Sequence, residues 1–172
     1  MKIFQVMPIV DDSKSKKLTP EQALARVRKY CAYQERSQQE VRDKLYSFGL
    51  HRNEVENIIA GLIDDGFLKE ERFAIAYAKG KFRMKKWGII KIKQALKEKK
   101  VSEPLIRKAL ASIDSNEYTN TLDELIRKRE QIVKEKNVFK RKYKIAQYCI
   151  SRGFEPELVW EILKVRSDEV TR

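Results

Sequence analysis

Apolar residues recur three and four positions apart along most of the chain, which is the spacing of one face of an α-helix. The clearest instances are the pairs Val41/Leu45, Ile92/Leu96 and Ile145/Cys149. Beyond residues 4–6, we find no segment that alternates with the period of two typical of a half-buried strand. The pattern therefore predicts an all-α fold without a sheet.

Capping signals divide this pattern into short helices. Thr19 and Ser37 each stand three residues before a glutamine or glutamate, which is the arrangement of a capping box. Glycines at 49, 66 and 153 follow apolar stretches and are typical of helix ends. These signals predict nine helices, with a polar break at 114–120 and the seventh helix over about 121–136.

The chain contains an internal repeat. Leu45 can be set over Leu96 and Cys149 at offsets of 51 and 104 residues, with no gap over about twenty positions. The same register superimposes Val41/Ile92/Ile145, Leu50/Val101/Phe154, Val55/Ile106/Val159 and Gly49/Lys100/Gly153. Stacked units of one kind contact mainly their neighbours. We therefore expect an elongated row of three tandem three-helix repeats at 19–66, 67–113 and 114–172, after a lead-in at 1–18.

Positive charge is concentrated in the middle and in the last third of the chain. The net charge is +13, yet residues 20–72 balance to −1, whereas 79–108 carry +10 and 126–144 carry +7. A local excess of one sign attracts phosphate backbones and anionic protein surfaces. The alternative is a solvated lysine-rich face that only keeps the protein soluble.

The candidate contact residues follow from this distribution. Those expected to meet phosphate are Lys81, Arg83, Lys85, Lys86, Lys91, Lys93, Arg127, Lys128, Lys140, Arg141, Lys142 and Lys144. In the nearly neutral first repeat, Arg36 and Arg72 are candidates for contact with a partner protein. Trp87, between lysines and Gly88, either packs at the corner between two helices or stacks on a base. Phe67 and Phe73 are expected to link the cores of the first two repeats.

No set of residues supports catalysis. Two cysteines and one histidine supply neither a usual zinc site nor a disulfide framework. Cys149 occupies a leucine position of the repeat, so we expect a buried structural thiol. Paired carboxylates at 64–65 and 70–71 can bind Mg²⁺, but they also suit the dipole at the start of a helix. We expect no enzyme activity, no cofactor and no metal.

The chain lacks an apolar run long enough to cross a bilayer, and its first residues are too short and mixed for a signal peptide. We therefore expect a monomeric cytoplasmic protein with no membrane partner.

Three segments in order resemble the RecX family, the regulators of the bacterial recombinase RecA. They are ERSQQEVRDKL at 35–45, DGFLKEERFA at 65–74 and KKWG at 85–88. The resemblance covers about residues 22–165. It implies a fold of three tandem three-helix repeats and a role in DNA repair, recombination and the SOS response. It also implies binding in the groove of the RecA–DNA filament, which mostly inhibits ATPase and strand exchange.

The resemblance and the charge together predict two kinds of partner. These are the RecA filament, and single- and double-stranded DNA bound weakly and without sequence preference. The alternative is a DNA-binding protein of tandem helix-turn-helix type, such as a transcription factor. Against it, no outward-facing helix is rich in Arg, Asn and Gln, and the third predicted helix is acidic.

Overall fold

The structure is a computed structural model that describes the backbone of residues 17–170 and the side chains of residues 17–166. The expected lead-in at 1–18 lies outside the described residues, apart from Lys17 and Leu18. Within the described part there are nine α-helices and no strand, which confirms the all-α prediction. They are α1 (Pro20–Tyr33), α2 (Gln38–Ser47), α3 (Arg52–Asp64), α4 (Glu70–Lys85), α5 (Ile89–Glu98), α6 (Glu103–Ala111), α7 (Ser115–Ile132), α8 (Val138–Ser151) and α9 (Pro156–Val170).

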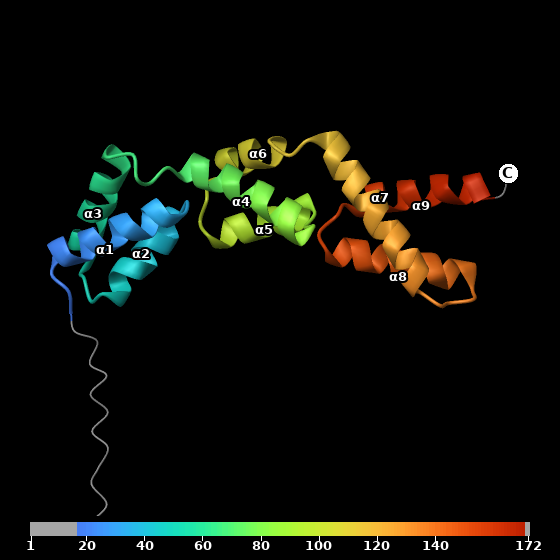
Figure 1. Ribbon diagram of the computed structural model, residues 1–172, viewed down its shortest axis with the longest axis horizontal. Helices are drawn as coiled ribbons and strands as arrows, with labels where there is room; N and C mark the ends of the chain where they lie inside the picture. The colour runs from blue at the N-terminus through green and yellow to red at the C-terminus, as the bar shows by residue number, and fades with distance from the viewer. Residues whose placement is uncertain (1–16, 171–172) are drawn as a thin grey trace, which may run out of the picture.

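The helices form three groups that follow one another in a row (Figure 1). The first unit comprises α1–α3, the second α4–α6 and the third α7–α9, and each occupies its own stretch of the long axis. The predicted elongated array of three-helix repeats is therefore confirmed.

The backbone repeats with the register that the sequence predicts. Leu45, Leu96 and Cys149 are all fully buried, in α2, α5 and α8. Each of these helices is followed by a residue in the left-handed region, with φ of 83° at Gly49, 58° at Lys100 and 92° at Gly153. Glycine reaches this conformation without strain, whereas lysine does not. The three units thus share one helix-ending turn.

The second and third units share one hydrophobic core. A single cluster of buried residues runs from Phe73 in α4 to Leu163 in α9. Its aromatic centre joins Phe82 to Tyr118 and Tyr118 to Phe154, with ring centroids 5.6 and 5.1 Å apart. Backbone hydrogen bonds add to this junction, because Ile90 N donates to the Gly153 carbonyl at 3.0 Å. Apolar packing and backbone hydrogen bonds therefore join these two units.

The first unit has its own core, and charged side chains join it to the second unit. Its buried cluster extends from Ala23 to Leu68. Across the joint, Lys99 pairs with Glu40 at 2.5 Å and Arg72 pairs with Glu35 at 2.5 Å. The first and second units therefore meet through ion pairs rather than through a continuous core.

Two expectations about this region were wrong. Phe67 and Phe73 do not link the cores, because Phe67 packs against the first cluster and Phe73 belongs to the second. The break at 114–120 is also absent, because α7 begins at Ser115 and ends at Ile132. The Asp114 carboxylate caps this helix by accepting a hydrogen bond from Glu117 N at 2.7 Å. Tyr118 is the one large apolar residue in that turn, which left no periodic signal.

Candidate partner-binding surface

The corner between α4 and α5 gathers several of the predicted cations. Lys86 ends α4 in the left-handed region, at φ 51°, and so turns the chain into Trp87. The Trp87 ring is partly buried against the shared core. The ammonium groups of Lys81 and Lys91 lie 5.2 and 4.9 Å from its centroid. These contacts support the packing role of Trp87 over the base-stacking one.

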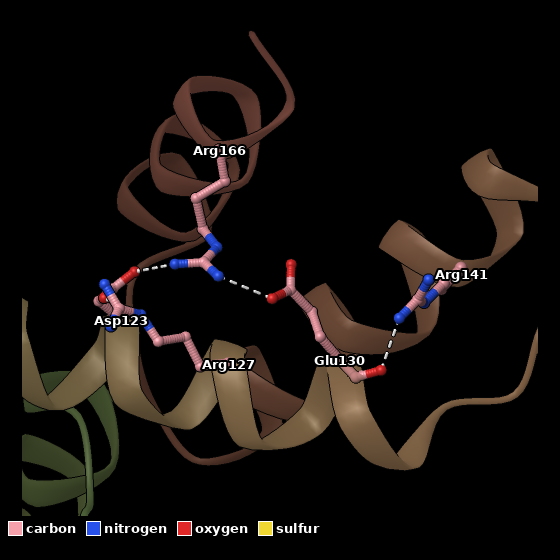
Figure 2. Close-up of polar contacts among 5 residues, drawn as sticks. All are labelled: Asp123, Arg127, Glu130, Arg141 and Arg166. Carbon is pink, nitrogen blue, oxygen red and sulfur yellow. Dashed lines mark hydrogen bonds and ion pairs between the residues drawn. The ribbon is translucent and has the colours of Figure 1, made fainter. Parts of the chain in front are cut away.

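In the third unit, arginines join α7 to its neighbours (Figure 2). Arg166 of α9 reaches between Asp123 and Glu130 of α7, with N–O distances of 2.7 and 2.8 Å. Arg127 pairs with Asp123 at 2.9 Å, and the Arg141 guanidinium of α8 donates to the Glu130 carbonyl at 2.6 Å. Arg141 therefore helps to join α8 to α7, whereas the Arg127 pair lies within α7 and leaves the arginine side chain largely exposed.

The fourteen predicted contact residues fall into groups according to their intramolecular partners. Ion pairs engage Arg72, Arg83, Lys93, Arg127 and Lys144, with Glu35, Glu117, Glu103, Asp123 and Glu135 respectively. Aromatic rings lie under Lys81, Lys91 and Arg36, the last 3.8 Å above Tyr30. Arg141 is held by the backbone carbonyl. The remaining five have no ion pair with any described residue: Lys85, Lys86, Lys128, Lys140 and Lys142.

The structure also identifies cations that the charge pattern missed. The Arg152 guanidinium donates to the Lys85 carbonyl and so adds a positive charge to the α4–α5 corner from the third unit. Lys99 lies within the basic segment at 79–108, but the sequence has no signal for its pairing with Glu40, 59 residues away. Arg152 lay outside the basic segment at 126–144, so composition gave no signal for it.

Several side-chain pKa values are shifted by contacts that stabilise the fold. A hydrogen bond from Lys93 lowers the pKa of Glu103, and one from Lys144 lowers the pKa of Glu135. Burial, together with a hydrogen bond from its hydroxyl to Glu155 at 2.5 Å, raises the pKa of Tyr118. Burial raises the pKa of the Cys149 thiol to about 11.

Within the described residues, no three His, Cys, Asp or Glu side chains are grouped so that they could hold a metal ion. No described helix is both long and apolar enough to span a membrane.

Comparison with known proteins identifies the two units that share a core. Residues 70–110 match the family model of the second three-helix domain of RecX, and residues 116–163 match that of the third. Regulatory protein RecX of Clostridium perfringens (strain 13) is 30% identical over 122 residues, which cover 70% of this chain and 57% of that protein. The RecX of Geobacillus sp. (strain WCH70) is 26% identical over 140 residues, covering 81% and 52%. This chain thus spans about half the length of the curated relatives it matches.

Solved structures share the fold. RecX from Lactobacillus salivarius superimposes with a TM-score of 0.77 at 23% identity, covering 84% of this chain and 94% of that one. A second crystal structure of regulatory protein RecX gives a TM-score of 0.77 at 21% identity, covering 84% and 71%. Since two domain models, the curated relatives and the fold agree, the chain belongs to the RecX family of regulatory proteins.

Proposed function

We propose that this chain binds the RecA–DNA filament and mostly inhibits its ATPase and strand exchange. The observation that carries the proposal is the set of five lysines, defined above on the second and third units, that form no ion pair with a described residue. Their charge is not neutralised by the described part of the chain, so it is available to phosphates or to acidic protein side chains. The elongated row of units suits contact along a filament (Figure 1).

In this proposal the first unit binds a different partner from the second and third units. The second and third units carry the free lysines and meet the polyanion. The first unit, whose segment 20–72 balances to −1, meets protein. Arg36 and Arg72 were candidates for this protein contact, but both side chains make contacts within the chain. Arg36 lies over Tyr30, and Arg72 pairs with Glu35.

The test is a RecA–single-stranded-DNA ATPase assay in which the protein is titrated in. The variant replaces Lys85, Lys86, Lys140 and Lys142 by glutamine. Each phosphate contact contributes about −0.7 to the salt slope on single strands, so losing four contacts flattens the slope by roughly 3. Inhibition should weaken accordingly, and the fold should persist because these lysines are at least partly exposed and form no ion pair with a described residue.

A matched control removes the same charge from the first unit, at the exposed residues Arg26, Lys29, Lys44 and Arg52. This control should keep the wild-type salt slope, because the first unit is not expected to meet phosphate. Failure of the wild type to affect the ATPase would refute the proposed function. An equal flattening of the salt slope in both variants would show that only net charge matters and would overturn the assignment of the surface.

A further inference from the structure

Helix α8 begins one turn earlier than its counterparts in the other units. The repeat register equates Lys142 with Gln38 and Ile89, the residues at which α2 and α5 begin. Helix α8 instead begins at Val138, and the Asn137 side chain caps it by accepting from Lys140 N at 3.0 Å. The turn at 138–141 is therefore an addition to the repeat.

This extra turn exposes large apolar side chains. Phe139 is 78% exposed and Val138 is 69% exposed, while Tyr143 in the next turn is 53% exposed. The repeat places Glu35 and Lys86 where the third unit has Phe139, so the shared fold does not require an aromatic ring there. A phenylalanine left largely in water loses the stabilisation that burial would give it. No described residue covers it, so its exposure leaves room for an occupant.

The two rings share one face of the helix. Phe139 and Tyr143 are four residues apart, so they lie on adjacent turns of the same face. Lys140 is three residues before Tyr143 and is its neighbour on the helix surface. Lys140 and Lys142 form no ion pair with any described residue. Within 134–144 there are six cations and one acid, Glu135, which pairs with Lys144 at 2.8 Å.

We propose that this turn stacks the bases of a single-stranded nucleic acid on Phe139 and Tyr143, while Lys140 and Lys142 neutralise the flanking phosphates. The net positive charge favours a polyanion over an apolar protein surface. Flat exposed rings favour bases whose faces are free, as in a single strand and not in a duplex. The inference deepens the proposed function, since it assigns one subsite for the DNA of the filament.

The test compares two oligonucleotides of equal length and charge, one with mixed bases and one abasic throughout. The wild type should bind the base-containing strand about tenfold more tightly, since stacking on two rings strengthens binding by at least that factor. The Phe139→Ala/Tyr143→Ala variant should lose this preference. Its affinity for the abasic strand and its salt slope should stay those of the wild type, because the lysines remain.

The matched control is Tyr33→Ala/Met84→Ala, which removes side chains that are 84% and 82% exposed elsewhere on the molecule. This control should keep the preference for the base-containing strand. A Phe139→Trp/Tyr143→Trp variant, which carries aromatic rings at both positions, should also show that preference. Circular dichroism confirms that each variant is folded.

Equal binding of both oligonucleotides by the wild type would overturn the inference, and so would a preference that survives in the ring-deleted variant. If that variant kept the preference but no longer inhibited RecA, the turn would be a protein-docking surface instead. The proposed function fails separately, when the wild type leaves the ATPase unchanged.

Discussion

Leu96 lies fully buried in the core that the second and third units share. Its truncation removes packed methyl groups and leaves a cavity that a two-unit core cannot easily close. Leu96→Ala should lower the free energy of unfolding by about 2–5 kcal/mol, measured by urea denaturation. Ile90→Ala, at a side chain that is 49% exposed, should cost less than about 1 kcal/mol. Similar losses in the two variants would contradict the core position of Leu96.

Lys100 holds a left-handed conformation, φ 58°, where the other two units have glycine. Because a side chain is strained in this region, Lys100→Gly should raise the free energy of unfolding by about 1 kcal/mol. Lys97→Gly, in the last turn of α5, should lower it by a similar amount. The melting temperatures of the two variants test this expectation. If both temperatures shift in the same direction, Lys100 is not strained.

Cys149 should be an unreactive thiol. It is fully buried, and burial raises its pKa to about 11, so the thiol stays protonated at pH 8. Cys31 is also buried and its pKa is raised for the same reason. Ellman's reagent at pH 8 should therefore modify the native protein slowly and both thiols quickly in denaturant. The native rate should rise as the pH approaches 11, and rapid native labelling at pH 8 would refute the assignment.

Burial at single positions could be predicted because it follows the repeat register. Cys149 stands at the repeat position that leucines hold in the first and second units. Such a position is buried in all three units, although the packing partners differ. Whether a cation forms a contact within the chain could not be predicted in this way. Arg83 is 34 residues from Glu117, with which it pairs, and Arg141 donates to a backbone carbonyl, which no sequence pattern marks. The basic segments were visible in the sequence, but the five unpaired lysines depend on tertiary contacts.

At the scale of elements, two glycines set the junction between the second and third units. A Cβ atom at Gly88 would meet the Gly153 carbonyl oxygen at 2.1 Å. Gly88 N also donates to the Arg152 carbonyl at 2.9 Å. The Trp87-Gly88 pair was recognised as a motif, but its reason is this close approach between backbones 65 residues apart in sequence.

Gly88→Ala should therefore lower the free energy of unfolding by about 1–3 kcal/mol, because backbone atoms must separate to admit the methyl group. Gly80→Ala is the control, since its Cβ would meet nothing within 4 Å and the residue lies inside α4. That change should raise stability by up to about 1 kcal/mol. The melting temperatures of both variants are measured by calorimetry. If both temperatures rise, the junction tolerates a side chain at position 88.

Helix limits were predictable where caps were strong and failed where apolar spacing was sparse. Ser37 caps α2 as its sequence predicts, with the Oγ atom accepting from Glu40 N at 3.1 Å. The start of α7 was missed because its first turns bury little besides Tyr118 and Thr121. The long connection expected before α7 is instead found after it, where Val133 to Asn137 lead into α8.

At the scale of the whole molecule, the second and third units form one body and the first unit is attached by charge. Glu40 carries part of this attachment, beside the Arg72–Glu35 pair. One of its carboxylate oxygens accepts from Ser37 N in the helix cap, and the other pairs with Lys99 of the second unit at 2.5 Å. Ion pairs at partly exposed sites weaken with salt, whereas a shared apolar core does not. The angle between the two bodies should thus depend on ionic strength.

Glu40→Gln separates the two roles of this residue. Glutamine also fits the third position of a capping box, so α2 should remain capped, while the ion pair with Lys99 is lost. With fluorophores at Asn53→Cys and Arg107→Cys, both exposed, single-molecule energy transfer reports the distance between the bodies. The wild type should show a narrow distribution at low salt that broadens at 1 M, where the Debye length is about 3 Å. Glu40→Gln should already be broader than the wild type at low salt, although the Arg72–Glu35 pair still joins the two units.

Lys108→Gln supplies the control, because it breaks the 2.6 Å pair with Glu71 inside the second unit and should leave the distribution unchanged. The native cysteines are buried, so they should take up the dyes slowly at neutral pH. A wild-type distribution that stays narrow at 1 M salt would mean that the joint is rigid for another reason. A joint that loosens would let the nearly neutral first unit move independently of the basic second and third units.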